Sequence, residues 1–370
     1  MQQMQALISS GRMHSLPVAR PAMIYTAHNR KNTHCSAVAH STSAMPAQQC
    51  SALWSKVLQV YDAAQASGAA TKADTKVHTY RDGNVEFVLR IASALKSKPK
   101  GLSGSAGSAA TPNKQQQQQG PPAGFRNPFL PYEEALWVQH LSGSHTLLLN
   151  KFNVVPHHVL VVTREFESQQ EPLNARDLAA TQQVLDAMPR GGVAFYNCGE
   201  HSGRSQPHKH LQIVPLPFQE DQASQQQQQQ PQQTSAAQMP VQQLISAAQA
   251  AAGAQPLQPF PVRQAPFRAY AAVLGQSATA EQLEAAAGQL LAHCQAGLPA
   301  PVSYNVILTQ QLLLMVPRKQ ESCGRIAVNS LGFAGTILLR SEEDLQFAQQ
   351  QGPMSMLAEV GQPWSSEPAE

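Results

Sequence analysis

The chain lacks the features that mark membrane-spanning, disulfide-stabilised or nucleic-acid-binding proteins. No apolar run among its 370 residues reaches the length of a membrane-spanning helix. The five cysteines are odd in number and include no C-x-x-C pair, which argues against a disulfide framework and a cysteine-built zinc site. The net charge is only +3, so the overall charge does not point to nucleic acid or an anionic membrane surface.

Acidic side chains are missing from residues 1–50, and the first one along the chain is Asp62. The same segment carries arginine and lysine and is rich in serine, threonine and alanine, without the continuous apolar core of a secretory signal. This composition is typical of an organelle transit peptide. The alternative is an ordinary disordered N-terminus with biased composition. The serine and threonine content favours a chloroplast destination over a mitochondrial or cytoplasmic one.

Two low-complexity segments divide the rest of the chain. Each contains a glutamine run and too few apolar residues to offset the entropy of folding, so we expect disordered insertions or linkers. Part of the second, at 241–252, could form a short helix. The expected organisation is a catalytic region at 51–217 with a Gln-rich insertion at 98–124, a Gln/Ala-rich linker at 218–258, a C-terminal region at 259–345 that completes the fold, and a tail at 346–370.

Hydrophobic periodicity predicts helices that are separated from runs of strands. Helices are expected at 51–67, 173–188 (with Asn174 as its cap) and 280–296. Strands are expected at 84–92, 145–149, 159–163, 193–197, 208–214, 303–308, 311–316 and 335–340. Short turns between strands indicate an α+β fold with a mostly antiparallel sheet and flanking helices.

The most informative stretch is Ser205-Gln-Pro-His-Lys-His-Leu-Gln212, which follows a loop of glycine and serine residues. In a strand, alternate side chains share a face, so His208, His210 and Gln212 should point one way and Lys209 the other. A neutral imidazole is a nucleophile at phosphorus if its second ring nitrogen is held by an acceptor. The loop amides and Gln212 could bind the phosphate oxygens.

Two other interpretations of the histidines remain open at this point. They could bind zinc together with Cys198 or His201, or they could be structural residues bonded to backbone carbonyl groups. Spacing alone does not separate these possibilities from phosphate chemistry.

Several blocks together resemble the ATP adenylyltransferases, also called diadenosine tetraphosphate phosphorylases, in the transferase branch of the histidine-triad superfamily. Besides 205–212, the blocks that carry the resemblance lie at 87–99, 127–129, 145–158, 162–169, 303–318 and 328–335. The resemblance covers about 51–345 without the glutamine insertions. It implies a histidine-triad-like, galactose-1-phosphate-uridylyltransferase-like fold.

The resemblance also implies a mechanism. His210 would attack the α-phosphorus of diadenosine tetraphosphate (Ap4A), release ATP and carry AMP, which inorganic phosphate would then remove as ADP. His208 would support the phosphate site and Gln212 would hold the transferred phosphate. Substrate contacts are expected from Lys98, Asn150, Lys151, Gly203, Arg204, Ser205, Gln206, Asn305, Met315 and Lys319. The protein itself would bind no metal, Mg²⁺ would accompany the polyphosphate, adenosine 5'-phosphosulfate is a further substrate in the family, and a monomer is expected.

One residue departs from the family pattern, because Arg204 stands where the loop usually has alanine. Three other functions are kept as alternatives. They are hydrolysis of dinucleoside polyphosphates, nucleotide binding without catalysis, and an interaction protein organised by its glutamine runs.

Overall fold

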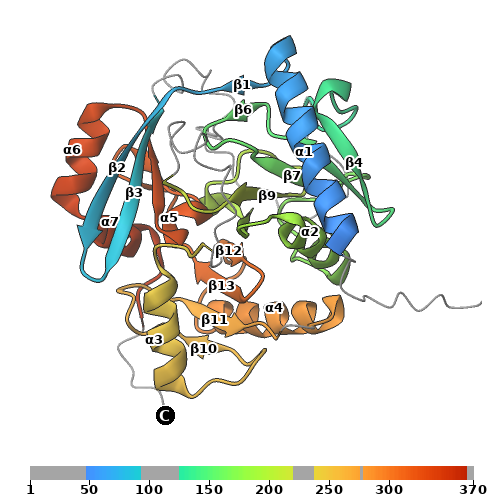
Figure 1. Cartoon of the computed structure of the whole chain (residues 1–370). Helices are drawn as coiled ribbons and strands as arrows, with labels where there is room; N and C mark the ends of the chain where they lie inside the picture. Colours follow the sequence, from blue (N-terminus) through green and yellow to red (C-terminus); the bar gives the residue numbers. More distant parts are fainter. Residues whose placement is uncertain (1–46, 93–124, 220–236, 276–277, 365–370) are drawn as a thin grey trace, which may run out of the picture. The chain divides into compact units, whose positions relative to one another are not determined.

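The computed structural model describes residues 47–92, 125–219, 237–275 and 278–364 (Figure 1). Lys98, the insertion at 98–124, most of the expected transit peptide and the glutamine run of the second low-complexity segment lie outside these ranges. No helix in the described part is both long and apolar enough to cross a membrane.

Every helix and strand predicted from the sequence is present within a few residues, and the structure contains further helices and strands that were not predicted. The helices are α1 (Ala47–Ser67), α2 (Ala175–Ala187), α3 (Gln242–Ala252), α4 (Ala280–Gln295), α5 (Ser330–Ala334), α6 (Glu342–Gln351) and α7 (Pro353–Val360). The strands are β1 (Thr71–Lys72), β2 (Thr75–Asp82), β3 (Val85–Ala92), β4 (Trp137–Leu141), β5 (His145–Leu149), β6 (Phe152–Asn153), β7 (Val159–Thr163), β8 (Gly192–Cys198), β9 (His210–Pro215), β10 (Phe260–Pro261), β11 (Tyr270–Val273), β12 (Tyr304–Leu308), β13 (Leu312–Pro317), β14 (Ser322–Cys323), β15 (Ile326–Ala327) and β16 (Thr336–Leu339).

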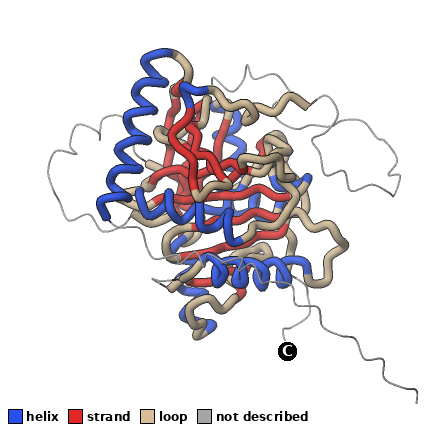
Figure 2. Tube along the Cα trace, turned by 90° about the vertical axis from the view of Figure 1, so that its right-hand side faces the viewer, coloured by secondary structure: helices blue, strands red, loops and turns tan. Residues whose placement is uncertain are grey.

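The largest sheet among the described residues has nine strands in the order β10-β11-β13-β12-β8-β9-β7-β5-β4. Every neighbouring pair in it is antiparallel. A smaller sheet has the order β16-β3-β2, in which β16 runs parallel to β3. The fold is therefore α+β with a mostly antiparallel sheet and flanking helices, as the sequence predicts. Figure 2 shows the strands in red with helices in blue along their sides.

The two faces of the large sheet bury different elements. One face packs against α1, α2 and α4, and it includes Leu211 and Ile213 of β9. The other packs partly against the small sheet and against α3, α5 and α7, and it includes Phe195 of β8 and Val214 of β9. Burial on both faces explains why β8, β12 and β13 read as continuous apolar runs.

Strands from both halves of the chain meet at the centre of the sheet. β8 pairs with β9 on one side and with β12 on the other, with Phe195 opposite Gln212 and Asn197 opposite Asn305. The segments before and after the second low-complexity region therefore build one sheet. The catalytic strand predicted from the sequence, β9, lies beside the strand that joins the halves.

Two segments pack more extensively than the sequence indicates. The expected linker at 218–258 contains α3, whose Ile245 and Ala248 are buried. The boundary that begins a tail at 346 does not hold for 346–360, because this stretch includes α7, whose Met356 and Leu357 are fully buried. Both segments cover apolar surface of the sheet, which a local composition argument does not detect.

Candidate active site

His210 is the first residue of β9, and its ring is held in one tautomer. Its Nδ1 lies 2.8 Å from the carbonyl oxygen of His208. A carbonyl oxygen only accepts hydrogen bonds, so Nδ1 carries the proton and the Nε2 of a neutral ring keeps a lone pair. Burial, with a smaller contribution from nearby His208, lowers the pKa of His210 to about 4. The ring is therefore neutral and nucleophilic at pH 7.

His208 supports this arrangement and has no free ring nitrogen. Its Nε2 lies 3.0 Å from Thr163 O and 3.1 Å from Glu165 O, to which it donates, and its Nδ1 lies 2.8 Å from the Asn127 amide nitrogen, which donates to it. Burial lowers the pKa of His208, so it too is neutral. It positions the carbonyl group that fixes His210, in agreement with a supporting rather than a nucleophilic role.

The predicted faces of the catalytic strand are confirmed. His210 and Gln212 share the face on which Phe195 lies, and the Gln212 carboxamide makes no hydrogen bond to the described residues. Phe129 packs against both imidazoles, with ring centroids 5.7 Å from His208 and 5.2 Å from His210. The glutamine is therefore available to a ligand beside His210.

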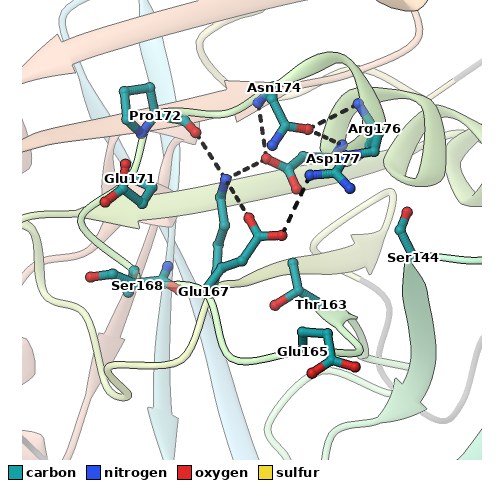
Figure 3. Close-up of polar contacts among 12 residues, drawn as sticks. Ser144, Thr163, Glu165, Glu167, Ser168, Glu171, Pro172, Asn174, Arg176 and Asp177 are labelled. Carbon is teal, nitrogen blue, oxygen red and sulfur yellow. Dashed lines mark hydrogen bonds and ion pairs between the residues drawn. The ribbon is translucent and has the colours of Figure 1, made fainter. Parts of the chain in front are cut away.

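Lys209 points to the opposite face and is 1% exposed. Its ammonium lies 2.6 Å from Asp177 and 3.5 Å from Glu167, and it donates to Pro172 O at 2.9 Å. Figure 3 shows Glu167, Pro172 and Asp177 converging on this position beside the start of α2. Asp177 also lies 2.9 Å from Nε2 of His145 and belongs to the capping box of α2. Burial alone would raise the pKa of Asp177, but the hydrogen bond with His145 and the charge of Lys209 lower it below its ordinary value. Lys209 therefore anchors the back of the catalytic strand to α2.

The glycine-bearing loop 199–205 is fixed by residues from the C-terminal half. Gly203 has φ 77°, and a β-carbon there would lie 2.9 Å from Val328 O, so glycine is required by both conformation and space. Ser202 O accepts hydrogen bonds from Asn305 Nδ2 at 2.9 Å and from Arg318 at 3.4 Å. The loop that could bind an anion is thus held on buried side chains from β12 and the end of β13.

A second buried amide, which the sequence reasoning missed, connects these parts. Oδ1 of Asn197 accepts from Asn305 Nδ2 at 2.8 Å and from the hydroxyl of Ser330 at 2.7 Å. Its Nδ2 makes no hydrogen bond within the described chain, and it lies on the sheet face of Gln212. Asn197 is therefore positioned to donate to a bound ligand. Its location at the end of a buried strand, directly before the glycine loop, is the signal that could have identified it.

The other predicted substrate contacts differ in where their side chains lie. Arg204 and Gln206 are half-buried and Ser205 is exposed, so the loop itself is reachable from solvent. The Ser202 hydroxyl, in contrast, donates a hydrogen bond to Gly199 O at 2.7 Å. Asn305 has its amide engaged by Asn197, Ser202 and Arg318, so it acts through the loop.

Asn150 and Lys151 lie at the end of β5. The Asn150 amide donates to Phe152 O at 2.9 Å and contacts His158, and Lys151 pairs with Glu133 at 2.7 Å on the surface. Lys319 is exposed. None of these contacts joins Asn150, Lys151 or Lys319 to His210. Their predicted contacts with a long polyphosphate stay a prediction.

Met315 does not join the predicted site. It lies opposite Val306 in the β12–β13 ladder and is buried on the face that packs against α4, whereas Asn305 shares the face of Asn197. Because successive strand residues alternate in direction, a one-residue difference decides the face. Cys198 occupies the α-helical face too, so it cannot share a zinc ion with His210. No group of three or more His, Cys, Asp or Glu side chains with metal-binding geometry occurs in the described residues.

A cavity of about 230 Å³ is lined by Phe129, which contacts both histidine rings, and by Thr163, whose hydroxyl contacts His208. Its wall includes aromatic Phe129, Tyr132 and His140 and aliphatic Leu148 and Val162, and Val162 is the ladder partner of His210. A cavity whose wall combines these aromatic and aliphatic side chains with the polar Thr146, Thr163 and Arg164 fits a heteroaromatic base attached to a phosphate chain.

Comparisons with known proteins identify the family of the chain. Residues 43–245 match the family model described as Ap4A phosphorylase N-terminal domain, and residues 263–363 match ATP adenylyltransferase C-terminal domain. The chain belongs to the Ap4A phosphorylase family. It is therefore an enzyme with nucleotidyltransferase activity, as the sequence resemblance predicts.

The similarity extends to individual relatives. Diadenosine tetraphosphate phosphorylase 2 of Saccharomyces cerevisiae is 32% identical over 250 residues, which cover 58% of this chain and 69% of the relative. The structure of the yeast Ap4A phosphorylase Apa2 in complex with Ap4A has a TM-score of 0.63 at 25% identity, and the match covers 85% of this chain and 99% of that one. The Apa2 complex with AMP gives a TM-score of 0.65 at 24% identity.

Proposed function

We propose that this enzyme phosphorolyses Ap4A to ATP and ADP through an AMP–histidine intermediate on His210. The observation that carries the proposal is the hydrogen bond from Nδ1 of His210 to His208 O, which leaves Nε2 with its lone pair. The relatives named for Ap4A phosphorylase activity, and the Apa2 structure with Ap4A, support the choice of substrate.

The reaction divides into two displacements at one phosphorus atom. Nε2 of His210 attacks the α-phosphorus of Ap4A, the bond from that phosphorus to the bridging oxygen breaks, and ATP leaves with the electron pair. An oxygen of inorganic phosphate then attacks the same phosphorus, the P–N bond breaks, and ADP leaves. Gln212, Asn197 and the loop amides donate hydrogen bonds to the non-bridging oxygens, where negative charge accumulates.

The cavity beside the histidines takes the adenine of the transferred AMP. Phe129 lines the cavity and contacts both imidazoles, so a base held there is close to the nucleophile. Half-buried Arg204, which replaces the small residue usual in this loop, adds positive charge for the departing polyphosphate.

Mg²⁺ would be bound mainly through phosphate oxygens and water. Mg²⁺ commonly binds in this way, and no protein cluster of metal ligands occurs in the described residues. Adenosine 5'-phosphosulfate as a second substrate, a monomeric state and import into the chloroplast belong to the same proposal, the last resting on the composition of residues 1–50.

The decisive experiment separates phosphorolysis from hydrolysis. The purified enzyme is incubated with Ap4A and Mg²⁺, with and without inorganic phosphate, and the nucleotides are separated. We expect ATP and ADP in equal amounts only when phosphate is present. His210→Ala should lose covalent labelling by radioactive Ap4A and lower turnover by at least about 10⁴-fold while retaining the fold. Full turnover by this variant would refute the covalent mechanism, and ATP with AMP as products would show hydrolysis.

A further inference from the structure

The pairing between β8 and β9 stops short of the nucleophile. The ladder runs from Gly192 opposite Pro215 to Phe195 opposite Gln212. The same register continued by two residues would place Asn197 opposite His210. On their other edges the two strands stay paired further along. β8 pairs with β12 up to Cys198 opposite Tyr304, and β9 pairs with β7 up to His210 opposite Val162. The two central strands therefore separate between the loop at 199–205 and the catalytic ring.

The side chain of Gln169 occupies this separation. Its Oε1 accepts the backbone N–H of His210 at 2.8 Å. Its Nε2 donates to the carbonyl oxygen of His210 at 3.2 Å and to that of Asn197 at 3.1 Å. One carboxamide thus takes the place of the backbone bonds that β8 would make to β9, and it satisfies both backbone groups of the nucleophile.

Gln169 is itself held firmly, which allows it to act as a fixed bridge. It is 1% exposed, its N–H donates to Pro207 O at 2.8 Å, and the hydroxyl of Tyr196 lies 2.9 Å from its carbonyl oxygen. The residue before it forms an antiparallel bridge with His208. A buried amide with these partners has a single orientation, because any rotation would leave donors or acceptors unsatisfied.

We propose that Gln169 is a positioning residue for the transfer reaction, whose carboxamide sets the distance between the nucleophilic ring and the anion-binding loop. The inference rests on the proposed role of His210. The loop begins directly after Asn197 and Cys198, so the bridge from Asn197 O to the backbone of His210 links the two components of the site. A displacement of about 1 Å between reacting groups can slow a transfer about 100-fold.

The first test removes the bridge and keeps the volume. Gln169→Met has a side chain of similar length without the amide, and Gln170→Met, at the exposed neighbouring position, is the matched control. We expect kcat for Ap4A phosphorolysis to fall about 100-fold in Gln169→Met, with KM changed by less than about threefold, because the binding groups remain while the attack geometry is lost. Gln170→Met should keep both constants.

A second variant tests whether the side chain at position 169 must donate a hydrogen bond. Gln169→Glu retains the acceptor for the His210 N–H, but an ionised carboxylate would face two carbonyl oxygens. Only the protonated acid can donate to one of them, and burial raises the pKa of such a carboxyl. We therefore expect kcat of Gln169→Glu to rise as the pH is lowered from 8 to 6, relative to wild type at each pH.

A direct probe of the ring makes the result independent of the substrate. Nitrogen-15 NMR of labelled histidine should show His210 in wild type as a single neutral tautomer protonated at Nδ1, and a mixture of tautomers or exchange broadening in Gln169→Met. If wild-type protein did not convert Ap4A, the proposed function would fail, while the NMR spectra would still decide the role of Gln169. Unchanged His210 signals in a folded Gln169→Met, or a kcat equal to that of wild type, would overturn the inference.

Discussion

The two faces of strand β9 carry adjacent residues with opposite tasks. On one face, Nδ1 of His210 is occupied and Nε2 has no hydrogen-bond partner among the described residues, and Gln212 keeps an unengaged carboxamide. On the other face, the ammonium of Lys209 is enclosed by Asp177, Glu167 and a carbonyl oxygen. The open face has polar groups left for a ligand, which is what the proposed chemistry requires, whereas the closed face gives stability because its groups are fully used.

This difference shows how a strand can hold a reactive group rigidly. Lys209 lies between the two histidines in sequence, and its backbone N–H donates to Glu167 O at 2.8 Å. The ion pair with α2 therefore restrains the peptide that joins His208 to His210. Substitutions on the two faces should consequently separate stability from catalysis.

The largest effect on stability is expected from Lys209→Met. Removing the ammonium leaves Asp177 as a buried carboxylate without its cation, and such losses cost about 3–5 kcal/mol. Urea unfolding should show a decrease of this size, with a much smaller effect on kcat of the folded enzyme than His210→Ala has. A double variant with Asp177→Asn should recover part of the stability, because no unpaired charge remains. A Lys209→Met protein that unfolds at the wild-type urea concentration would contradict the comparison.

A smaller effect, on catalysis, is expected from Asn127→Ala. This change removes the donor to Nδ1 of His208 and frees one end of the ring that supports His210. Loss of one hydrogen bond of about 1 kcal/mol predicts a decrease in kcat of roughly fivefold to tenfold. Arg126→Ala at the exposed neighbouring position is the control. If both variants had equal kcat, His208 would not need the amide for its orientation.

The sequence predicted most of the fold because its signals are local. The strands at 145–149 and 159–163 have the expected bounds, and Asn174 caps α2 by accepting from the N–H of Asp177 at 3.1 Å. The strand that carries His210 was also found, together with the faces of His210 and Lys209. These features follow from side-chain alternation, cap chemistry and hydrophobic runs, which a single segment carries.

The features that were missed depend on partners distant in the chain. The burial of Lys209 requires α2, and the bridge made by Gln169 requires the divergence of β8 and β9. Met315, which was predicted to contact the substrate, is buried on the helical face because of its register with β12, and that register is not visible in one strand. β11 is rich in alanine and gives little strand signal. For α7, Pro353 at its first turn and the nearby methionines were usable signals.

The smallest predicted effect concerns the pH dependence of the first displacement by His210, whose rate should not fall as the pH is lowered below neutrality. Because burial lowers the pKa of His210 to about 4 from an ordinary value near 6.5, lowering the pH from 7.5 to 5.5 leaves the ring unprotonated. The folded state binds fewer protons than the unfolded state between these two pKa values, so this group contributes stability that is lost as the pH falls from about 6.5 to 4. Single-turnover release of ATP from Ap4A, measured without phosphate so that the acceptor does not titrate, should vary less than about twofold from pH 7.5 to 5.5. A rate that fell tenfold with an apparent pKa near 6.5 would mean that the nucleophile is solvated rather than buried, and the distinction between the two faces of β9 would then be lost.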